Sequence, residues 1–209
     1  MTLQRKITRS VGKNLSFYLT GSVLTAITIM LLVGAFAVSN SLYFCFDDYF
    51  AKTNIEDGYF TTQEPISEEE KEELEAGYDL TLEKQQYVDL EYHDTKLRLH
   101  TQTQNVDLYT ISEGRDIESG DELVLTYNYA KANGIAVGDK LKLAGREFTV
   151  CGLGMKSDYA IMLYDLSETI PNKSGFGIGI ITQETMVELG TPMEFYSVRY
   201  RDPEQERAF

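Results

Sequence analysis

The feature that most constrains this chain is an uncharged run of 33 residues, Asn14 to Phe46, which lies between Lys13 and Asp47. Its centre, residues 23–38 (VLTAITIMLLVGAFAV), is almost wholly apolar. A helix needs about 20 mostly apolar residues to cross the hydrocarbon core of a bilayer. At about 1.5 Å per residue, this run would form a helix roughly 50 Å long, enough to cross a membrane and emerge from it. The sequence therefore predicts a transmembrane helix over residues 14–46.

Charge is divided unevenly between the two sides of this run. Residues 1–13 hold four of the 19 basic residues (Arg5, Lys6, Arg9 and Lys13) and none of the 33 acidic ones, which leaves 15 basic against 33 acidic residues in the rest of the chain. Lys and Arg flanking a span stay on the cytoplasmic side. We therefore expect residues 1–13 to be a cytoplasmic basic amphipathic segment lying on membrane lipid, and residues 47–209 to be one extracytoplasmic domain.

A cleaved signal peptide is the alternative to a retained anchor. The apolar run is longer than the stretch of about 7–15 residues typical of a signal peptide, which favours the anchor. Within the span, small residues recur at four-residue spacing at Ser22, Ala26 and Gly34, with Met30 between them. Such a face lets a second helix approach closely, although ordinary use of small residues in membrane helices explains the spacing equally well.

Beyond the span, the hydrophobic pattern predicts short helices and alternating strands. Ser67 and Glu70 fit a capping box for a helix that runs to about Glu75 and stops at Gly77. Apolar residues then alternate with polar ones on both sides of a turn at residues 93–96, which predicts antiparallel strands. Further strands are predicted at 58–62, 106–111, 122–125, 140–143, 147–151, 159–164, 176–181 and 195–200, and further helices at 127–133 and 182–189. The predicted fold class is therefore α+β: one N-terminal transmembrane helix followed by a mixed domain of mainly antiparallel strands with short helices.

The residues that usually carry chemistry do not form a recognisable set. His93 and His100 lack metal-ligand spacing and are expected to be surface residues, and Cys45 and Cys151 are expected to be unpaired thiols. There is no nucleophile elbow and no phosphate-binding loop with the required spacing. The acidic domain also argues against nucleic-acid binding. We expect no enzyme activity, no catalytic residue, no metal and no cofactor.

Residues 113–153 (EGRDIESGDELVLTYNYAKANGIAVGDKLKLAGREFTVCGL) resemble the extracytoplasmic core domain of FtsX-like and MacB-like ABC transporter permeases. The positions that match the family's structural motif are Gly114, Arg115, Glu122, Ala130, Gly138, Asp139 and Gly152. Gly114 and Gly138 can adopt turn conformations that are closed to other residues. The segments Ser157–Tyr159 and Phe176–Gly177 are similar to the large-ectodomain branch common in Gram-positive bacteria.

This resemblance implies a function for the chain and a set of partners. The chain would be the N-terminal part of a permease, with further spans expected beyond it, and would pair with a cytoplasmic ATPase subunit and a second permease copy. The complex would export a peptide, lipid or lipoprotein, or transmit mechanical force. The alternative is a stand-alone, membrane-anchored binding or sensor protein with no ATPase.

Overall fold

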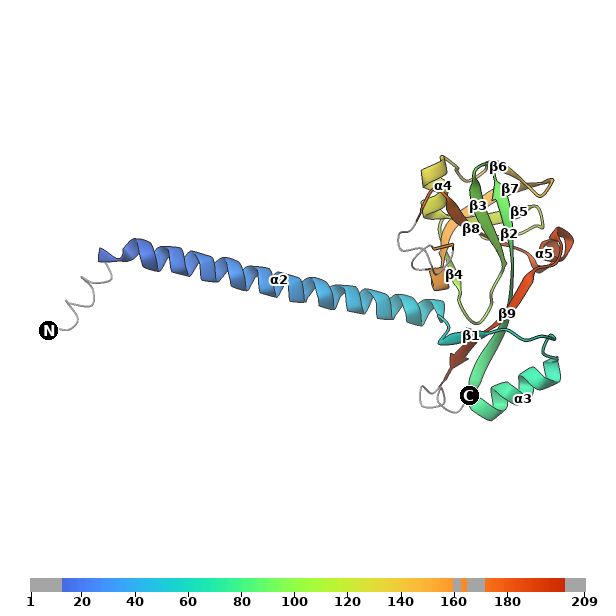
Figure 1. The fold of residues 1–209 in the computed structure, drawn as a ribbon, viewed down its shortest axis with the longest axis horizontal. Helices are drawn as coiled ribbons and strands as arrows, with labels where there is room; N and C mark the ends of the chain where they lie inside the picture. Colours follow the sequence, from blue (N-terminus) through green and yellow to red (C-terminus); the bar gives the residue numbers. More distant parts are fainter. Residues whose placement is uncertain (1–12, 160–162, 165–171, 202–209) are drawn as a thin grey trace. The chain divides into compact units, whose positions relative to one another are not determined.

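The computed structural model describes residues 13–159, 163–164 and 172–201. The chain divides into two compact units, residues 1–49 and residues 50–209. The predicted fold class is confirmed, because a long apolar helix is followed by an α+β domain with a nine-stranded, mostly antiparallel sheet and short helices (Figure 1).

Helix α2 (Leu15–Thr53) contains the whole uncharged run except its first residue and continues beyond Phe46. In the part of the chain that the structure describes, it is the one helix long and apolar enough to cross a membrane, with a mean hydropathy of 2.2 over an 18-residue window. A signal sequence near the N-terminus would share these properties. The hydroxyl groups of Thr20, Thr25 and Thr28 each donate to the carbonyl four residues earlier, at 2.8–2.9 Å. These polar groups are therefore satisfied inside the helix, as a hydrocarbon environment requires.

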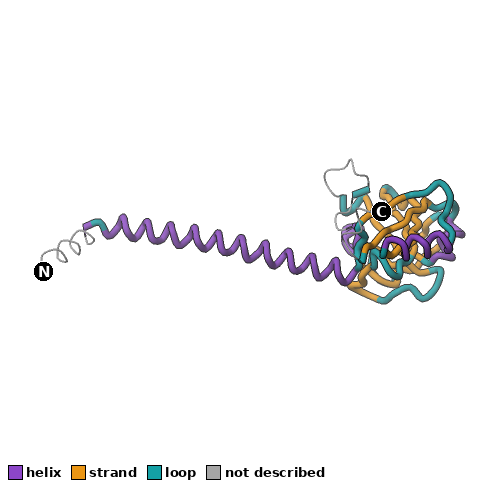
Figure 2. The backbone as a smooth tube through the Cα atoms, turned by 90° about the horizontal axis from the view of Figure 1, so that it is seen from below, coloured by secondary structure: helices purple, strands orange, loops and turns teal. Residues whose placement is uncertain are grey.

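The helices and strands of the domain follow α2 along the chain. They are β1 (Gly58–Phe60), α3 (Glu68–Tyr78), β2 (Leu80–Tyr92), β3 (Thr95–Thr101), β4 (Tyr109–Gly114), β5 (Glu122–Thr126), α4 (Tyr127–Asn133), β6 (Lys140–Leu143), β7 (Arg146–Lys156), the 3₁₀ turn η1 (Ser157–Tyr159), β8 (Phe176–Ile181), α5 (Gln183–Leu189) and β9 (Met193–Tyr200). Figure 2 shows the strands gathered in one body, with the helices at its outside.

The strands pair in the order β1-β9-β2-β3-β8-β5-β7-β4, and β6 adds to β7. Two of these pairs, β3 with β8 and β5 with β7, are parallel, and the others are antiparallel. Strand β2 is the longest and pairs with β9 along its first half and with β3 along its second half. The first half of β2 is therefore held beside a strand more than 100 residues later in the sequence, and the pocket described below is built there.

Helix α3 has the predicted capping box. The Ser67 hydroxyl accepts from the Glu70 backbone N–H, and the Glu70 carboxylate accepts from the Ser67 backbone N–H at 2.9 Å. The predicted end at Gly77 is wrong, because the helix includes Gly77 and ends at Tyr78, with Asp79 in the left-handed conformation at φ 48°. Asp at this position tolerates the left-handed region better than most residues do, so it replaces the expected glycine.

Two predicted strands are misplaced, in addition to smaller differences in bounds such as that of β7, which is longer than the predicted strand 147–151. Residues 106–108 are not in a strand, and β4 instead runs from Tyr109 to Gly114. In the predicted strand 159–164, Tyr159 ends the 3₁₀ turn and residues 163–164 are not in a strand, while residues 160–162 lie outside the described residues. The hairpin turn is also tighter than predicted, since only His93 and Asp94 separate β2 from β3.

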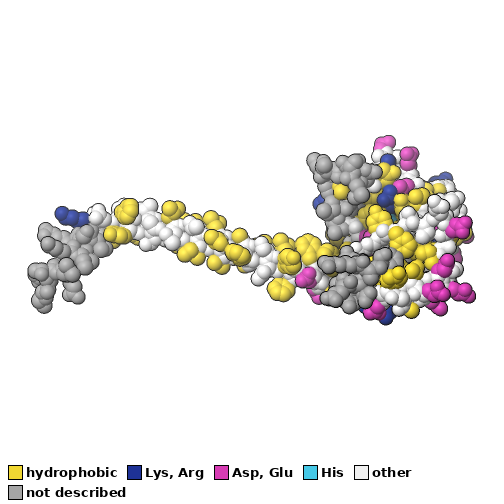
Figure 3. Space-filling model, turned by 60° about the horizontal axis from the view of Figure 1, so that its bottom comes forward, with side chains coloured by type: hydrophobic (Ala, Val, Ile, Leu, Met, Phe, Trp, Pro, Cys, Tyr) yellow, Lys and Arg dark blue, Asp and Glu magenta, His cyan; other side chains and the backbone are white. Residues whose placement is uncertain are grey.

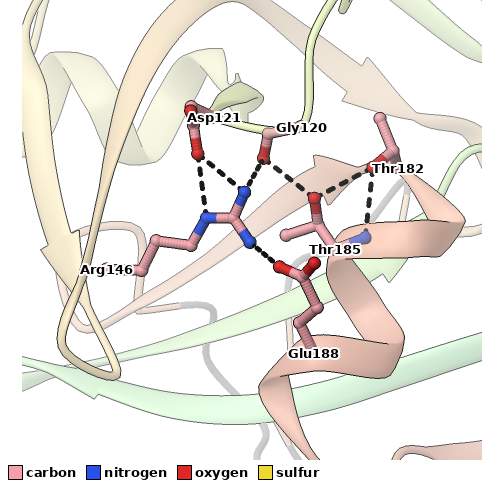
Figure 4. Close-up of polar contacts among 6 residues, drawn as sticks. All are labelled: Gly120, Asp121, Arg146, Thr182, Thr185 and Glu188. Atoms are coloured by element: carbon pink, nitrogen blue, oxygen red, sulfur yellow. Dashed lines mark hydrogen bonds and ion pairs between the residues drawn. The ribbon is translucent and has the colours of Figure 1, made fainter.

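The main core lies between the sheet and α4. It contains Leu97, Leu99, Leu123, Leu125, Tyr129, Ala130, Leu141, Leu143, Phe148, Val150, Leu153, Ile181 and Met186. Helix α5 is fixed to the edge of this region by Arg146, whose guanidinium donates to Asp121 at 2.6 Å and also pairs with Glu188 of α5 (Figure 4). Thr185 of α5 adds a hydrogen bond to the Gly120 carbonyl at 2.8 Å. This cluster joins α5 to the start of β5 and β7 and has a structural role.

Candidate functional site

A pocket of about 290 Å³ opens in the domain at the β2–β9 part of the sheet. It is bounded by residues from the segment around β1, from β2, β3 and β9, and from the stretch that begins at η1. The lining residues are Glu56, Tyr59, Thr61, Tyr87, Arg98, Asp158, Tyr159, Leu163, Tyr164, Met193, Glu194 and Phe195. They come from five separate stretches of the sequence, which the sheet pairing brings together.

Aromatic rings form much of the wall of this pocket. The ring centroid of Phe195 lies 5.9 Å from that of Tyr59 and 6.1 Å from that of Tyr87, both edge to face. The ring of the buried His100 lies 5.4 Å from Tyr159. These separations fall in the favourable range for aromatic pairs. The wall is therefore a set of rings that support one another.

Arg98 is the one basic side chain among the residues that line the pocket, and its charge is compensated. Its guanidinium donates to both carboxylate oxygens of Asp89, at 2.7 and 2.9 Å, and lies 4.4 Å from the Tyr87 ring centroid. Burial opposes the charge of Arg98, but the hydrogen bonds with Asp89 and Tyr159 raise its pKa above the usual value. Arg98 therefore stays charged and remains bound to Asp89.

A buried ion pair lies beside the aromatic wall. Lys156 is 1% exposed, and its Nζ lies 2.7 Å from Oδ2 of Asp158. Burial raises the pKa of Asp158, and the Lys156 charge opposes this effect. The other carboxylate oxygen of Asp158 is buried and has no hydrogen-bond partner among the described residues. Asp158 lines the pocket, and one of its two carboxylate oxygens therefore lacks a partner among the described residues.

The predicted surface position of His100 is wrong, because this residue is 1% exposed. Burial lowers its pKa well below the usual value, and the charges of Lys156 and Arg98 lower it further. Its Nε2 lies 3.2 Å from the Tyr159 hydroxyl. His100 is therefore a neutral part of the wall. His93, in the hairpin turn, is exposed as expected.

Glu56 is the unusual acid of this site. Burial raises its pKa to about 7, a hydrogen bond from Ser197 opposes this, and the charges of Asp107 and Asp158 raise it further. Asp107 is fully buried and accepts from the Glu56 backbone N–H at 2.8 Å and from the Gln85 side-chain amide at 2.6 Å. Among the described residues, no Lys or Arg forms an ion pair with Glu56. Its ionised form is therefore held without a compensating charge.

The position of Asp107 is fixed by a buried carboxylate on β2. Glu83 is 8% exposed and accepts three backbone N–H groups, from Gln104, Asn105 and Val106, each at 2.6 Å. A carboxylate that accepts several backbone donors holds a loop in one conformation. The loop after β3 therefore holds Asp107 in contact with the backbone of Glu56.

Glu56→Gln is expected to stabilise the domain by about 1–2 kcal/mol at pH 8, after allowance for solvent screening of a half-buried carboxyl. The raised pKa means that the folded state prefers the protonated form. Stability from this group is therefore present below its ordinary pKa of 4.5 and is lost as the pH rises through about 7. Urea unfolding at pH 5 and pH 8 should show that the wild-type chain loses this stability and that the variant does not. An equal loss in both chains would contradict the assignment to Glu56.

The motif positions of the sequence analysis lie away from this pocket. Arg115 Nη1 donates to Glu122 at 2.9 Å, and the hydrogen bonds from Arg115 lower the pKa of Glu122 to about 2. Gly114 lies at the end of β4 with φ +80°, next to Gly152 of β7. The other three positions lie elsewhere: Ala130 is buried in α4, and Gly138 and Asp139 form the turn before β6, where Asp139 accepts from the Ala136 N–H at 2.8 Å. These residues organise the fold around β5–β7, and none of them lines the pocket.

The small residues of the predicted packing face lie in α2. Ser22, Ala26 and Gly34 lie at four- and eight-residue intervals and are exposed, as is Met30. Their packing against another helix stays a prediction. Both cysteines are free, with Cys45 exposed and Cys151 buried. Within the described residues, no group of three His, Cys, Asp or Glu side chains is placed to hold a metal ion.

Comparisons with known proteins found a likeness among solved structures but none among families or curated proteins. No family model matches the sequence, and no curated protein matches it. Among solved structures, the chain is similar to the extracellular domain of the noncanonic ABC-type transporter YknZ from Gram-positive bacteria, with 14% sequence identity and a TM-score of 0.46. The match covers 74% of this chain and 87% of that chain.

Proposed function

We propose that this chain is the membrane-anchored N-terminal part of an ABC transporter permease, with its acidic domain outside the cytoplasmic membrane. The observation that carries the proposal is the sequence order: a basic segment, an uncharged helix long enough to cross a bilayer, and then an acidic α+β domain. The resemblance of residues 113–153 to permease core domains supports it. The chain itself is not an enzyme in this proposal, and ATP hydrolysis belongs to a cytoplasmic ATPase subunit.

The permease would act as a dimer and transmit movement from the ATPase to the outside domain, for export of a peptide, lipid or lipoprotein or for mechanical signalling. The face formed by Ser22, Ala26 and Gly34 would receive helices of the same permease. The chain beyond the span has an excess of acidic residues, and several acidic side chains are visible on the domain in Figure 3, which suits a domain that stays in water.

The pocket favours a second candidate function, a stand-alone anchored binding or sensor protein. A concave site with several aromatic residues and a few charged ones is typical of ligand binding. The permease function requires an ATPase partner, whereas the stand-alone binding or sensor function does not.

Labelling of single cysteines in intact cells tests the topology. In a chain that carries Cys45→Ser and Cys151→Ser, Glu72→Cys on α3 should react with a membrane-impermeant maleimide, whereas the matched Lys13→Cys should react only after the cells are lysed. The intact mass of the membrane-bound chain should include residues 14–46. A mature chain that begins near Val38 would refute the anchor, and labelling of Lys13→Cys in intact cells would refute the proposed orientation.

Affinity purification of the tagged full chain from its native membrane tests the partner. We expect an ATPase subunit to be recovered with the wild-type chain in a neutral detergent. Gly34→Leu should reduce recovery of other permease helices, because it fills the face at which a helix would approach. Recovery of the chain without any ATPase would favour the stand-alone binding protein.

A further inference from the structure

The charges that line the pocket are compensated except at Glu56. Asp158 pairs with Lys156 at 2.7 Å, and Glu194 pairs with Lys84 at 2.9 Å. Arg98 is likewise paired with Asp89, at 2.7 Å. Among the described residues, the groups that act on the Glu56 carboxyl are two acids, Asp107, which also hydrogen-bonds to it, and Asp158, together with the hydroxyl of Ser197. The pocket therefore has one unmatched negative charge, on the side where one oxygen of Asp158 also lacks a hydrogen-bond partner among the described residues.

This arrangement costs stability in the empty protein. Burying a carboxylate without a partner is unfavourable, and a glutamine at position 56 could keep the hydrogen bond from Ser197 without the charge. Features that lower stability without a structural benefit are commonly found at functional sites. The unmatched charge is therefore better explained by a ligand than by the fold.

The size and walls of the pocket restrict the ligand. A volume of about 290 Å³ lies at the lower end of the range for small-molecule sites, so it suits one small group. Tyr59 and Met193, which are 63% and 60% exposed, lie among the lining residues and offer apolar contact to an alkyl chain. Aromatic rings and a carboxylate together are the common environment for an organic cation.

We propose that this pocket binds an organic monocation, a primary ammonium or guanidinium group on a short alkyl stem, with Glu56 as its counter-ion and Tyr59 and Phe195 as its walls. A free amine and a basic side chain of a peptide present the same chemistry. The proposal does not depend on the permease assignment, so failure to recover an ATPase leaves it unchanged.

Ligand-observed NMR with the full chain in a maltoside micelle tests the proposal, since a detergent with a quaternary ammonium head would compete for the site. The probes are n-butylammonium, n-butanol and butyrate, at pH 8. We expect binding of n-butylammonium alone. Binding of butanol with the same affinity, preferential binding of butyrate at Arg98, or no binding of n-butylammonium would overturn the proposal. A peptide with one Arg, compared with n-butylguanidinium, separates the two sources: tighter binding of the peptide indicates a peptide side chain, and equal binding indicates a free cation, while both support the cation site.

Variants identify the residues. Glu56→Gln should weaken n-butylammonium binding about tenfold or more, because a charge-assisted contact is replaced by a neutral one. Tyr59→Leu should weaken it by roughly threefold to tenfold, in line with loss of a cation–π contact. The control Glu72→Gln, on the exposed face of α3, removes the same charge from the domain and should leave binding unchanged. Wild-type affinity in Glu56→Gln, or an equal loss in Glu72→Gln, would overturn the proposal. Because Glu56→Gln is expected to be more stable than the wild type, a loss of binding in it reports the site and not misfolding.

Discussion

Gly114→Ala is expected to destabilise the domain by about 3–5 kcal/mol, a large share of the stability of a typical domain. Gly114 has φ +80°, and a Cβ atom built there would lie 2.3 Å from the Cys151 carbonyl oxygen and 2.9 Å from the Gly152 Cα. Both atoms belong to the backbone of β7, so neither can move aside without breaking the β4–β7 pairing. Near-UV circular dichroism of the tyrosines during urea unfolding measures the loss.

Gly138→Ala is the matched control for this prediction. Gly138 also has a positive φ, +96°, but no atom lies within 4 Å of the position of its Cβ. The free energy of unfolding of this variant should fall by only about 1–2 kcal/mol, the strain of an alanine in the left-handed conformation. Equal losses in the two variants would show that backbone conformation, and not the contact with β7, decides the need for glycine at position 114.

Lys156→Met is expected to destabilise the domain by about 3–5 kcal/mol at pH 8. The Lys156 side chain is fully buried, and its removal leaves the Asp158 carboxylate buried without its cation. The loss should be smaller at pH 5, because burial already raises the pKa of Asp158 and a protonated carboxyl has no charge to bury. Urea unfolding at the two pH values measures both losses.

The double variant Lys156→Met with Asp158→Asn separates the ion pair from simple packing. It removes both charges, so it should recover most of the stability that Lys156→Met loses. If the double variant were no more stable than Lys156→Met, the side chain of Lys156 would act through packing, and the ion-pair account would be contradicted.

Hydrophobic periodicity correctly predicted those elements in which the buried residues are clearly apolar and the ends are marked by the sequence. Helix α4 matches its prediction of residues 127–133, because Tyr129 and Ala130 face the core and Gly134 ends the helix. β4 was misplaced, because none of its residues is fully buried and its alternation stops at Ser112, after which Glu113 and Gly114 are both exposed. Local sequence also does not determine that β3 pairs in parallel with β8, since this contact joins segments about 80 residues apart.

The pocket could not be found from the sequence, because its residues come from five stretches that only the sheet pairing brings together. One local signal was present. The apolar alternation of β2 is interrupted between Leu82 and Val88, and the structure buries Glu83, Gln85 and Gln86 there. Buried polar residues on a strand indicate a polar network, but not what it binds. The expectation of a surface His100 failed for the same reason, since two of the rings that contact it, Tyr159 and Phe195, lie far away in the sequence.

The pairing of β1 with β9 gives the domain a defined response to tension. The chain enters the sheet at Gly58 and leaves it after Tyr200, and Gly58 lies opposite Val198, so both ends are at the same edge of an antiparallel pair. A pull between Asp57 and Arg201 would unzip this pair one bond at a time, and β1 contributes only three residues to it. Tyr59 belongs to β1 and Glu56 lies two residues before this strand, so a stretched domain would open its pocket before the rest of the sheet yields, and tension on the domain would release the ligand.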